Sequence, residues 1–285
     1  MKLNKEIVEQ IRQDELHYET TLQSIADRIC ANKEIKIILI AGGSCAGKTT
    51  TTRKLSALIR EGGRNCHTVS LDDYYRNLDE SVYLPDGTRD IESVNSLRVD
   101  MIRESMTSLL AGKETPIPLF DFKTAIRTDD HRRITLGEKD AVIIEGLHAL
   151  NLSLFETAPQ KNSVFGIYLY ADAGDEMDCR FVRRLVRDSI HRNSDAEELF
   201  ALWRNIKANE RDSIEPFRQY ADVEINTFFP YERGILNDDA ILQLEKVEAS
   251  SPNYEIAKRI IEMLSPVPQI SHDYIPENSL MYEFI

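Results

Sequence analysis

The chain has 285 residues, 42% hydrophobic and 29% charged, which is the composition of an ordinary globular protein. Its formal net charge of −13, from 35 basic and 48 acidic residues, argues against nucleic acid or an anionic membrane as a partner, because both are bound through cationic surfaces. No apolar run is long enough to span a membrane, and the first ten residues lack the apolar segment of a signal peptide.

The cysteines indicate a reducing compartment. Cys30, Cys45, Cys66 and Cys179 are scattered without the spacing of a zinc site or of a disulfide framework. We therefore expect a cytoplasmic protein. The sequence leaves the oligomeric state open, a homo-oligomer included.

The first 33 residues read as a helical extension. Apolar residues recur at three- and four-residue spacing from Leu3 to Ile29, which predicts one or two amphipathic helices. This stretch contains no catalytic signal.

The strongest signal follows directly. An apolar run from Ile35 to Ala41 predicts a strand that is buried on both faces. The next residues, GGSCAGKT, fit the pattern G-x-x-x-x-G-K-[ST] of a phosphate-binding loop. A helix predicted from Thr50 to Arg60 would add the positive end of its dipole to the same anion. The predicted phosphate-binding residues are Gly42, Gly43, Ser44, Cys45, Ala46, Gly47, Lys48, Thr49 and Thr50.

Within this loop the residue types have separate tasks. Glycines let the backbone N–H groups surround phosphate oxygens, Lys48 reaches the β- and γ-phosphates, and the Thr49 hydroxyl ligates Mg²⁺. The alternative is a glycine-rich turn that matches the pattern by accident, roughly a one-in-a-hundred event in a chain of this length. The strand before the loop and the helix after it make such an accident rarer still.

Carboxylates follow two further predicted strands. His67–Leu71 leads into Asp72 and Asp73, and a phosphoryl acceptor needs a carboxylate to orient its hydroxyl and take its proton. Their spacing does not choose between the two, and a turn or helix cap is the alternative. The apolar strand Ala141–Ile144 runs into Glu145, which a Mg²⁺ ion held by Thr49 would neutralise; a solvent-exposed strand end is the alternative.

The order of the remaining elements predicts an α/β fold with a parallel sheet covered by helices on both faces. Ligands of such sheets bind at the carboxyl ends of the strands, where Asp72 and Glu145 lie. Residues 115–140 suggest a small antiparallel excursion. The other expected strands are 164–170 and 220–226, and the other expected helices are 95–111, 176–191, 195–219 and, as the one clear helix of the tail, 255–264.

Five arginines lie on or near one predicted helix: Arg180, Arg183, Arg184, Arg187 and Arg192. The first four share one helix face and would repel one another unless anions lay between them. Arginines from a closing segment can stabilise the charge that develops in phosphoryl transfer. The alternative is a solvated face that is balanced by Glu176, Asp178 and Asp188.

Four aromatic residues lie beside polar loops: Tyr74, Tyr75, Phe120 and Phe122. They could sandwich a planar base, or they could belong to the core.

Taken together, these stretches resemble the uridine kinases of the phosphoribulokinase/uridine kinase family. The matching segments, in the family's order, are GGSCAGKTT (42–50), SLDDYYR (70–76), PIPLFDFKTAIR (116–127), VIIEGLHAL (142–150), DCRFVRRLVRD (178–188) and YADVEIN (220–226). The resemblance implies a P-loop NTPase fold with a five-stranded, mostly parallel sheet in a core of residues 34–228. It also implies a β-hairpin at about 113–138, a helical lid at about 176–218, and a C-terminal extension, 229–285, packed on the core.

The resemblance also implies transfer of the γ-phosphoryl group of ATP, with Mg²⁺, to the 5′-hydroxyl of a pyrimidine nucleoside. Lys48 and the loop would hold ATP. By position, the other family roles fall on Asp72 as catalytic base, Tyr75 as nucleoside contact, Glu92 as ribose-binding carboxylate, Phe120 and Phe122 around the base, Glu145 beside the metal, and Arg184, Arg187 and Arg192 in the lid.

Three departures from the family concern the acceptor and the lid. A base-reading histidine is replaced by Ala125, the lid's R-G-R by Arg192-Asn193-Ser194, and a glutamine by Leu202. Loss of buried hydrogen-bond donors weakens discrimination at the base. Thymidine, another nucleoside or a sugar phosphate therefore stay open as acceptors, as does a nucleotide-binding regulator without transfer. A GTPase is disfavoured, because no N-K-x-D-type guanine motif follows the loop; Asn32-Lys33 precedes the loop and continues as Glu34-Ile35.

Overall fold

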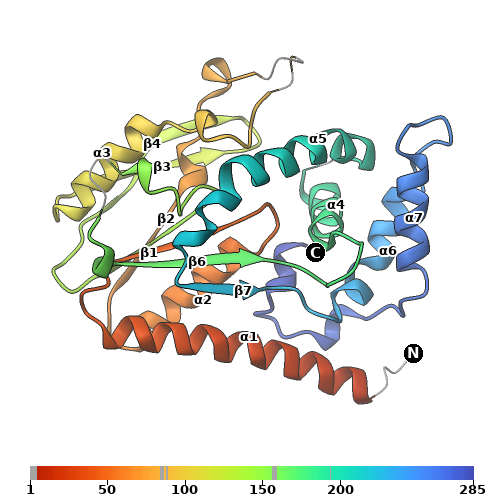
Figure 1. Cartoon of the computed structure of the whole chain (residues 1–285), viewed down its shortest axis with the longest axis horizontal. Coiled ribbons are helices and arrows are strands. Elements are labelled where there is room, and N and C mark those ends of the chain that lie inside the picture. The colour runs from red at the N-terminus through yellow and green to blue at the C-terminus, as the bar shows by residue number, and fades with distance from the viewer. Residues whose placement is uncertain (1–4, 84–86, 88, 156–158, 193) are drawn as a thin grey trace.

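We describe the protein from a computed structural model covering residues 5–83, 87, 89–155, 159–192 and 194–285. Helices and strands alternate along most of the chain, as the sequence predicts (Figure 1). The helices are α1 (Lys5–Ala31), α2 (Lys48–Glu61), α3 (Val99–Leu110), α4 (Cys179–His191), α5 (Ala196–Asn209), α6 (Glu232–Leu244) and α7 (Tyr254–Leu264). The strands are β1 (Ile37–Gly42), β2 (Cys66–Ser70), β3 (Thr115–Asp121), β4 (Ile126–Ile134), β5 (Ala141–Glu145), β6 (Val164–Tyr170) and β7 (Val223–Asn226).

Five strands form the main sheet in the order β2-β5-β1-β6-β7. Every pairing in it is parallel, so the sheet is parallel throughout rather than mostly so. The predicted five-stranded α/β architecture is confirmed. Because the strands share one direction, the ends of β1, β2 and β5 meet at one edge, which brings the phosphate-loop sequence, Asp72 and Glu145 together.

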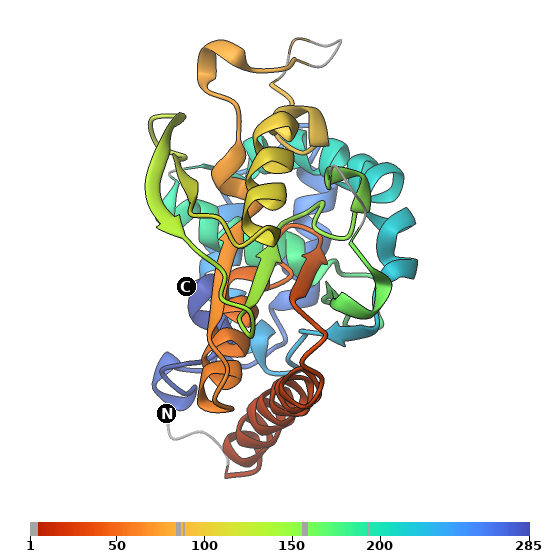
Figure 2. The same cartoon turned by 90° about the vertical axis from the view of Figure 1, so that its left-hand side faces the viewer.

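The sheet separates two hydrophobic cores, because successive side chains of a strand point to opposite faces. In β1, Ile38 and Ile40 join one core with α1, α2, α4, α6 and α7. Ile37 and Leu39 join the other core with α3 and the β3–β4 hairpin. Figure 2 shows α1 beneath the sheet and the hairpin standing to one side.

The antiparallel excursion is the two-stranded hairpin of β3 and β4. It turns through residues 122–125, where Ala125 has a positive φ of 53°. Only a few per cent of non-glycine residues adopt this left-handed conformation. The Asp73 side chain ties the hairpin to the sheet, since its Oδ1 accepts a hydrogen bond from the Phe120 N–H at 3.3 Å.

Several predicted boundaries were wrong. The tail contains a second helix, α6, in addition to α7. The helix expected from Asn95 begins at Val99, after a 3₁₀ turn at Val94–Ser96. The helix expected over 195–219 ends at Asn209 and continues as a π turn, Glu210–Ile214, and a 3₁₀ turn, Glu215–Tyr220. The N-terminal region is a single helix. The division into extension, core and tail stays a prediction.

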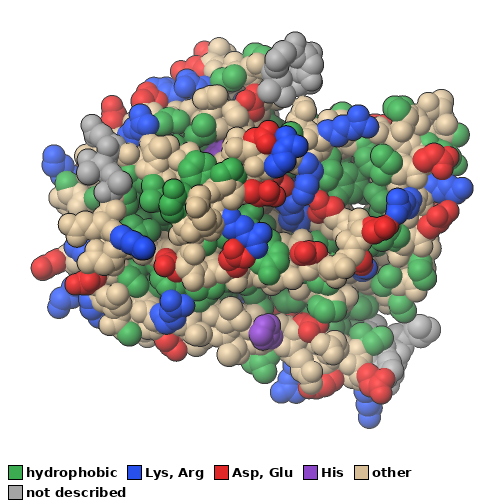
Figure 3. All heavy atoms as spheres, in the orientation of Figure 1, with side chains coloured by type: hydrophobic (Ala, Val, Ile, Leu, Met, Phe, Trp, Pro, Cys, Tyr) green, Lys and Arg blue, Asp and Glu red, His purple; other side chains and the backbone are tan. Residues whose placement is uncertain are grey.

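The surface carries both signs of charge. On the face in Figure 3, acidic and basic side chains are interspersed. Among the described residues, no helix combines the length and the apolar content that crossing a bilayer requires.

Candidate functional site

The glycine-rich loop joins β1 to α2, and the first backbone donors of the helix have no carbonyl partner within it. Gly47 precedes α2 with a left-handed φ of 82° and gives no side-chain cap. The first helical hydrogen bond across this junction runs from the Thr51 N–H to the Gly47 carbonyl, at 3.0 Å. The N–H groups before Thr51 therefore have no partner within the helix, which suits an anion.

Contacts with neighbouring side chains fix the shape of this loop. At Gly43 a Cβ would lie 2.0 Å from Nη1 of Arg180 and 2.3 Å from Oε1 of Glu210, so a larger residue would have to displace this ion pair. Cys45 has a φ of 57°, an uncommon conformation for a side chain that is not glycine. The Lys48 ammonium donates to the carbonyls of Gly42 and Gly43, at 3.1 and 3.0 Å.

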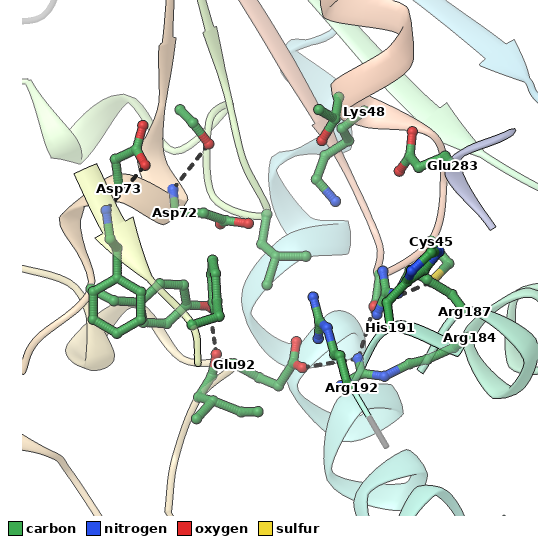
Figure 4. Close-up of a pocket in the computed structure, with 18 of the residues that line it drawn as sticks. Cys45, Lys48, Asp72, Asp73, Glu92, Arg184, Arg187, His191, Arg192 and Glu283 are labelled. Carbon is green, nitrogen blue, oxygen red and sulfur yellow. Dashed lines mark hydrogen bonds and ion pairs between the residues drawn. The ribbon is translucent and has the colours of Figure 1, made fainter. Parts of the chain in front are cut away.

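A cavity of about 910 Å³ opens beside this loop (Figure 4). It reaches from the start of α2, past the ends of β2 and β5, to the hairpin and the last turn of α4. The predicted site residues that line it are Ser44, Cys45, Lys48, Thr49, Asp72, Tyr75, Glu92, Phe120, Phe122, Glu145, Arg184, Arg187 and Arg192. The other predicted residues, Gly42, Gly43, Ala46, Gly47 and Thr50, form the loop wall and the start of α2 instead.

The structure distinguishes the two aspartates after β2. Asp73 holds the hairpin through Phe120, and burial raises its pKa. The Asp72 carboxylate lines the cavity and makes no hydrogen bond to another described residue. In Figure 4 the two side chains diverge, Asp72 toward the cavity and Asp73 toward the hairpin backbone. Both aspartates line the cavity, but of the two only Asp72 has a carboxylate without a hydrogen bond to the described protein.

Glu145 is a buried carboxylate at the end of β5. Its Oε1 accepts a hydrogen bond of 2.6 Å from the Ser70 hydroxyl. Burial, together with the negative charge of Asp72, raises the pKa of Glu145 to about 7, while the Lys48 cation opposes the shift. The exposed Thr49 hydroxyl lines the same cavity.

These residues fit a Mg²⁺ ion. Mg²⁺ prefers oxygen ligands and usually keeps several waters, so one hydroxyl and one carboxylate suffice beside a bound triphosphate. A cation here would offset the charge of Glu145 that is otherwise costly to bury. Among the described residues, at this site as elsewhere, no three His, Cys, Asp or Glu side chains form a cluster suited to a metal, so the protein would supply only part of the coordination.

The raised pKa of Glu145 makes stability depend on pH. The folded state binds this proton more tightly than the unfolded state, so the free energy of unfolding falls as the pH rises from about 4.5 to about 7. Glu145→Gln lacks this dependence on pH. We expect its free energy of unfolding, relative to that of wild type, to be roughly 3 kcal/mol higher at pH 8 than at pH 5. Urea unfolding in EDTA at both pH values measures the difference.

The matched control for this prediction is Glu138→Gln, an exposed glutamate before β5. It should follow wild type at both pH values. If Glu145→Gln does the same, Glu145 is ionised in the folded protein at pH 5 and its pKa is not raised.

Three arginines at the end of α4 surround the carboxylate of Asp188. Its carboxylate accepts from Nε of Arg187 at 2.8 Å and from Nε of Arg184 at 3.2 Å, and Nε of Arg192 lies 3.5 Å away. Arg184 also pairs with Glu92, so two carboxylates face three guanidinium groups and this wall of the cavity keeps a positive charge. Burial, together with Arg187 and Arg184, lowers the pKa of Arg192.

The other two arginines of the helix do not line the cavity. Arg180 makes a bidentate ion pair with Glu210, at 2.6 and 2.8 Å, and Arg183 makes one with Glu232, at 2.6 and 3.0 Å. Both also donate to backbone carbonyls of the loop, at Ser44 and Cys45. The prediction that the four arginines of this helix face need bound anions between them is therefore wrong for Arg180 and Arg183, because carboxylates distant in sequence neutralise these two.

Aromatic rings form the far end of the cavity. The Phe120 and Phe122 ring centroids are 5.0 Å apart, and those of Tyr75 and Phe120 are 5.5 Å apart. The Tyr75 hydroxyl donates to the carbonyl of Ile91 at 2.6 Å, so only its ring remains for a ligand. The Arg192 guanidinium lies 5.6 Å from the Phe122 ring centroid and links α4 to the hairpin. Asn193, part of the altered lid sequence, lies outside the described residues.

Glu92 faces the cavity between the arginines and the rings. Its Oε1 accepts from Nη1 of Arg184 at 3.3 Å, whereas Oε2 is buried and has no partner among the described residues. Its carbonyl accepts from Nε2 of His148 at 2.8 Å and from Nδ2 of Asn209 at 2.9 Å. These two donors fix the backbone of Glu92 and leave one carboxylate oxygen for a ligand.

A model of the Phosphoribulokinase / Uridine kinase family matches residues 37–230, more than half of the chain. The chain belongs to this family. As a member of a kinase family it is a phosphotransferase, and its sheet, loop and hairpin are the family's P-loop fold.

Individual members of the phosphoribulokinase/uridine kinase family are distant. A uridine kinase of Staphylococcus haemolyticus is 30% identical over 191 residues, which cover 66% of this chain and 86% of that protein. A uridine kinase of Halobacterium salinarum is 27% identical over 187 residues, 65% of this chain and 77% of that protein. The solved structure of the YGR205w protein superimposes with a TM-score of 0.52 at 14% identity, over 68% of this chain and 86% of that one, and supports the fold alone.

Sequence reasoning missed several residues of this family member's site. Glu210 and Glu232 carry no motif, and only their burial with Arg180 and Arg183 reveals their role. Ser70 precedes Asp72 by two residues and could have been recognised as a strand-end donor. Glu283 lies near the end of the chain, where no local signal connects it with the cavity that it lines.

Proposed function

We propose that this phosphotransferase moves the γ-phosphoryl group of ATP to the 5′-hydroxyl of a pyrimidine nucleoside of the uridine or cytidine type, with Mg²⁺ bound between Thr49 and Glu145. The observation that carries the proposal is a single cavity with three parts in sequence: the phosphate loop, the free Asp72 carboxylate and the aromatic end. A donor phosphate, a hydroxyl and a planar base need these parts in this order.

The donor side of the proposal rests on charge. The N–H groups at the start of α2, the Lys48 ammonium and the three arginines around Asp188 surround one part of the cavity with positive groups. Lys48 would turn from the loop carbonyls to the phosphates when a donor binds. Mg²⁺ would neutralise charge on the phosphate oxygens, and Arg184 and Arg187 would stabilise the charge of the transferring group.

The acceptor side rests on Asp72, Glu92 and the rings. Asp72 would orient the acceptor hydroxyl and take its proton. The unpartnered Oε2 of Glu92 suits a ribose hydroxyl, because a buried acceptor without a donor is costly. Phe120, Phe122 and Tyr75 would hold the base. Uridine kinases among the relatives support a pyrimidine nucleoside.

A different acceptor is the second candidate. Ala125 lines the aromatic end of the cavity and brings no hydrogen-bond donor in its side chain. Thymidine, another nucleoside or a sugar phosphate would meet the same Asp72. The two candidates differ in the acceptor, not in the transfer.

The test is consumption of ATP with Mg²⁺ and a panel of acceptors: uridine, cytidine, thymidine, purine nucleosides and a pentose phosphate. We expect uridine or cytidine to give the largest stimulation; a larger effect of thymidine, a purine nucleoside or the pentose phosphate would favour the second candidate. If none of the acceptors raises turnover above the background, the proposal fails.

Phe122→Ala separates a base from a bare sugar phosphate. Phe122 is 52% exposed, so the change should leave folding intact. Since stacking on an aromatic side chain is worth about 1–3 kcal/mol per base, we expect the KM for a nucleoside to rise roughly tenfold with little change in kcat. Steady-state kinetics with the best acceptor of the panel measure both constants.

Leu119→Ala is the matched control for Phe122→Ala. Leu119 lies on β3 of the same hairpin, is 41% exposed and does not line the cavity. Its KM should equal that of wild type. An unchanged KM in Phe122→Ala would mean that the acceptor carries no base on this ring.

A further inference from the structure

The segment Ser279–Ile285 packs against the phosphate loop. Leu280, Met281 and Phe284 are completely buried. A Cβ at Gly47 would lie 2.4 Å from Cδ1 of Leu280, so the segment touches the loop residue that begins α2. The Phe284 ring lies 4.8 Å from the guanidinium carbon of Arg183, which also binds the loop.

Helix α1 holds this segment in place. The buried Glu15 carboxylate accepts hydrogen bonds from the hydroxyls of Ser279 and Tyr231. Oγ of Ser279 in turn accepts from the N–H of Met281 at 3.1 Å. Parts of the chain outside the region matched by the family model thus fix a short segment on the donor side of the cavity.

The packing of this segment places the carboxylate of Glu283 at the start of α2. Oε2 of Glu283 accepts a hydrogen bond of 3.1 Å from the Thr50 N–H, one of the donors at the start of α2 that have no partner within the helix. Glu283 also lines the cavity, and its charge contributes to the raised pKa of Glu145. Figure 4 shows Glu283 on the same side of the cavity as Lys48.

Like a phosphate group, the Glu283 carboxylate is an anion whose oxygens accept hydrogen bonds from backbone N–H groups. Phosphate groups and carboxylates compete for the same N–H groups at a helix N-terminus. The negative charges of a phosphate group and of Glu283 would also repel each other if both approached the Thr50 N–H. A donor phosphate that reaches the Thr50 N–H must therefore displace Glu283.

We propose that Glu283 is a resident competitor for the donor nucleotide, holding the Thr50 N–H until a phosphate group displaces it. This rests on the donor half of the proposed function and is independent of the acceptor. A competitor that holds the site nine-tenths of the time lowers the apparent affinity about tenfold. Glu283 would thus set the nucleotide concentration at which the enzyme is loaded.

The experiment is titration calorimetry of the full chain with ADP and, separately, with inorganic tripolyphosphate, each with and without Mg²⁺. Glu283→Gln removes the charge and keeps the shape, and Glu283→Ala removes the group. We expect both variants to bind both ligands about tenfold more tightly than wild type. Glu277→Gln, an exposed glutamate of the same tail, is the control and should bind as wild type does.

The outcomes separate the two proposals. If Glu283 only caps α2, the variants unfold at a lower temperature but bind with unchanged affinity, and the inference is overturned. Weaker binding by the variants overturns it too, since Glu283 would then help to hold the donor. No binding of ADP or tripolyphosphate by any form removes the proposed donor site together with this inference. Tighter binding without turnover on any acceptor supports the inference and refutes only the proposed transfer.

Discussion

Asp72→Asn should lower kcat with the best acceptor by roughly 10²- to 10⁴-fold, the usual contribution of a general base. The asparagine keeps the size of the side chain, but its neutral amide can neither accept the proton of the acceptor hydroxyl nor polarise that hydroxyl with a negative charge. The KM for ATP should change little, because the donor is held by the loop and the arginines. Steady-state kinetics with ATP and acceptor varied separately measure these constants.

Asp73→Asn is the matched control, since it changes the neighbouring carboxylate in the same way. Asp73 accepts a hydrogen bond from the hairpin backbone, and an amide oxygen can still accept it. We expect a loss in kcat of less than about tenfold, with the acceptor KM carrying any effect of a displaced hairpin.

Two results would refute the assignment of Asp72. Full activity in Asp72→Asn would leave the reaction intact and the base wrong. Equal losses in both variants would indicate that charge at this edge, not a proton acceptor, drives the effect. Asp72→Asn also removes one cause of the raised pKa of Glu145, so the pH dependence of stability should weaken in this variant.

The donor side could be predicted from the sequence because its signals are local. The apolar runs of β1 and β5 are long enough to mark buried strands, and the residues directly after them must meet at one edge of a parallel sheet. The glycine pattern and Lys48 lie within eight residues of each other. Asp72 could be chosen over Asp73 only by resemblance, and the hydrogen bond between Asp73 and the hairpin supplies the physical reason.

The helix α6 was missed because its own residues argue against it. Its sequence, ERGILNDDAILQL, contains a glycine, an asparagine and two aspartates, all poor helix formers. Packing decides instead: Ile235, Leu236 and Ala240 are buried in the core shared with α4 and α7. Tertiary contacts of this kind override local propensity and cannot be read from a window of sequence.

The arginine helix shows the same limit for charge. Spacing correctly placed four arginines on one helix, but a helix face spans a wide arc, and neighbouring positions along it can meet different surroundings. Arg184 and Arg187 meet the cavity, whereas Arg180 and Arg183 meet Glu210 and Glu232. Those partners come from later elements, so only the fold tells which charges are free to bind a ligand.

Breaking the pair of Arg183 and Glu232 should have the largest effect on stability. Arg183 is fully buried, and all five of its N–H donors are used: two on Glu232, two on Thr227 and one on the Cys45 carbonyl. Glu232→Gln leaves the guanidinium charge in the core without a counter-charge. We expect the free energy of unfolding to fall by about 3–5 kcal/mol, measured by urea denaturation.

The matched control is Glu224→Gln, which breaks the ion pair of Glu224 with Arg218 at the surface. Both of those side chains are about 40% exposed, and such pairs contribute about 1 kcal/mol or less. If Glu232→Gln costs no more than this control, the buried pair contributes little and Arg183 is neutralised by other means. A double variant, Arg183→Met with Glu232→Leu, should recover part of the loss, because it removes both buried charges together.

The same pair connects stability with function. Arg183 donates to the Cys45 carbonyl at 3.1 Å, and Cys45 holds the unusual φ that shapes the phosphate loop. The double variant would recover part of the stability without restoring this hydrogen bond. It should therefore bind nucleotide more weakly than wild type, even under conditions where both are equally folded. This result would show that Arg183 acts on the site through the backbone of the loop rather than by direct contact.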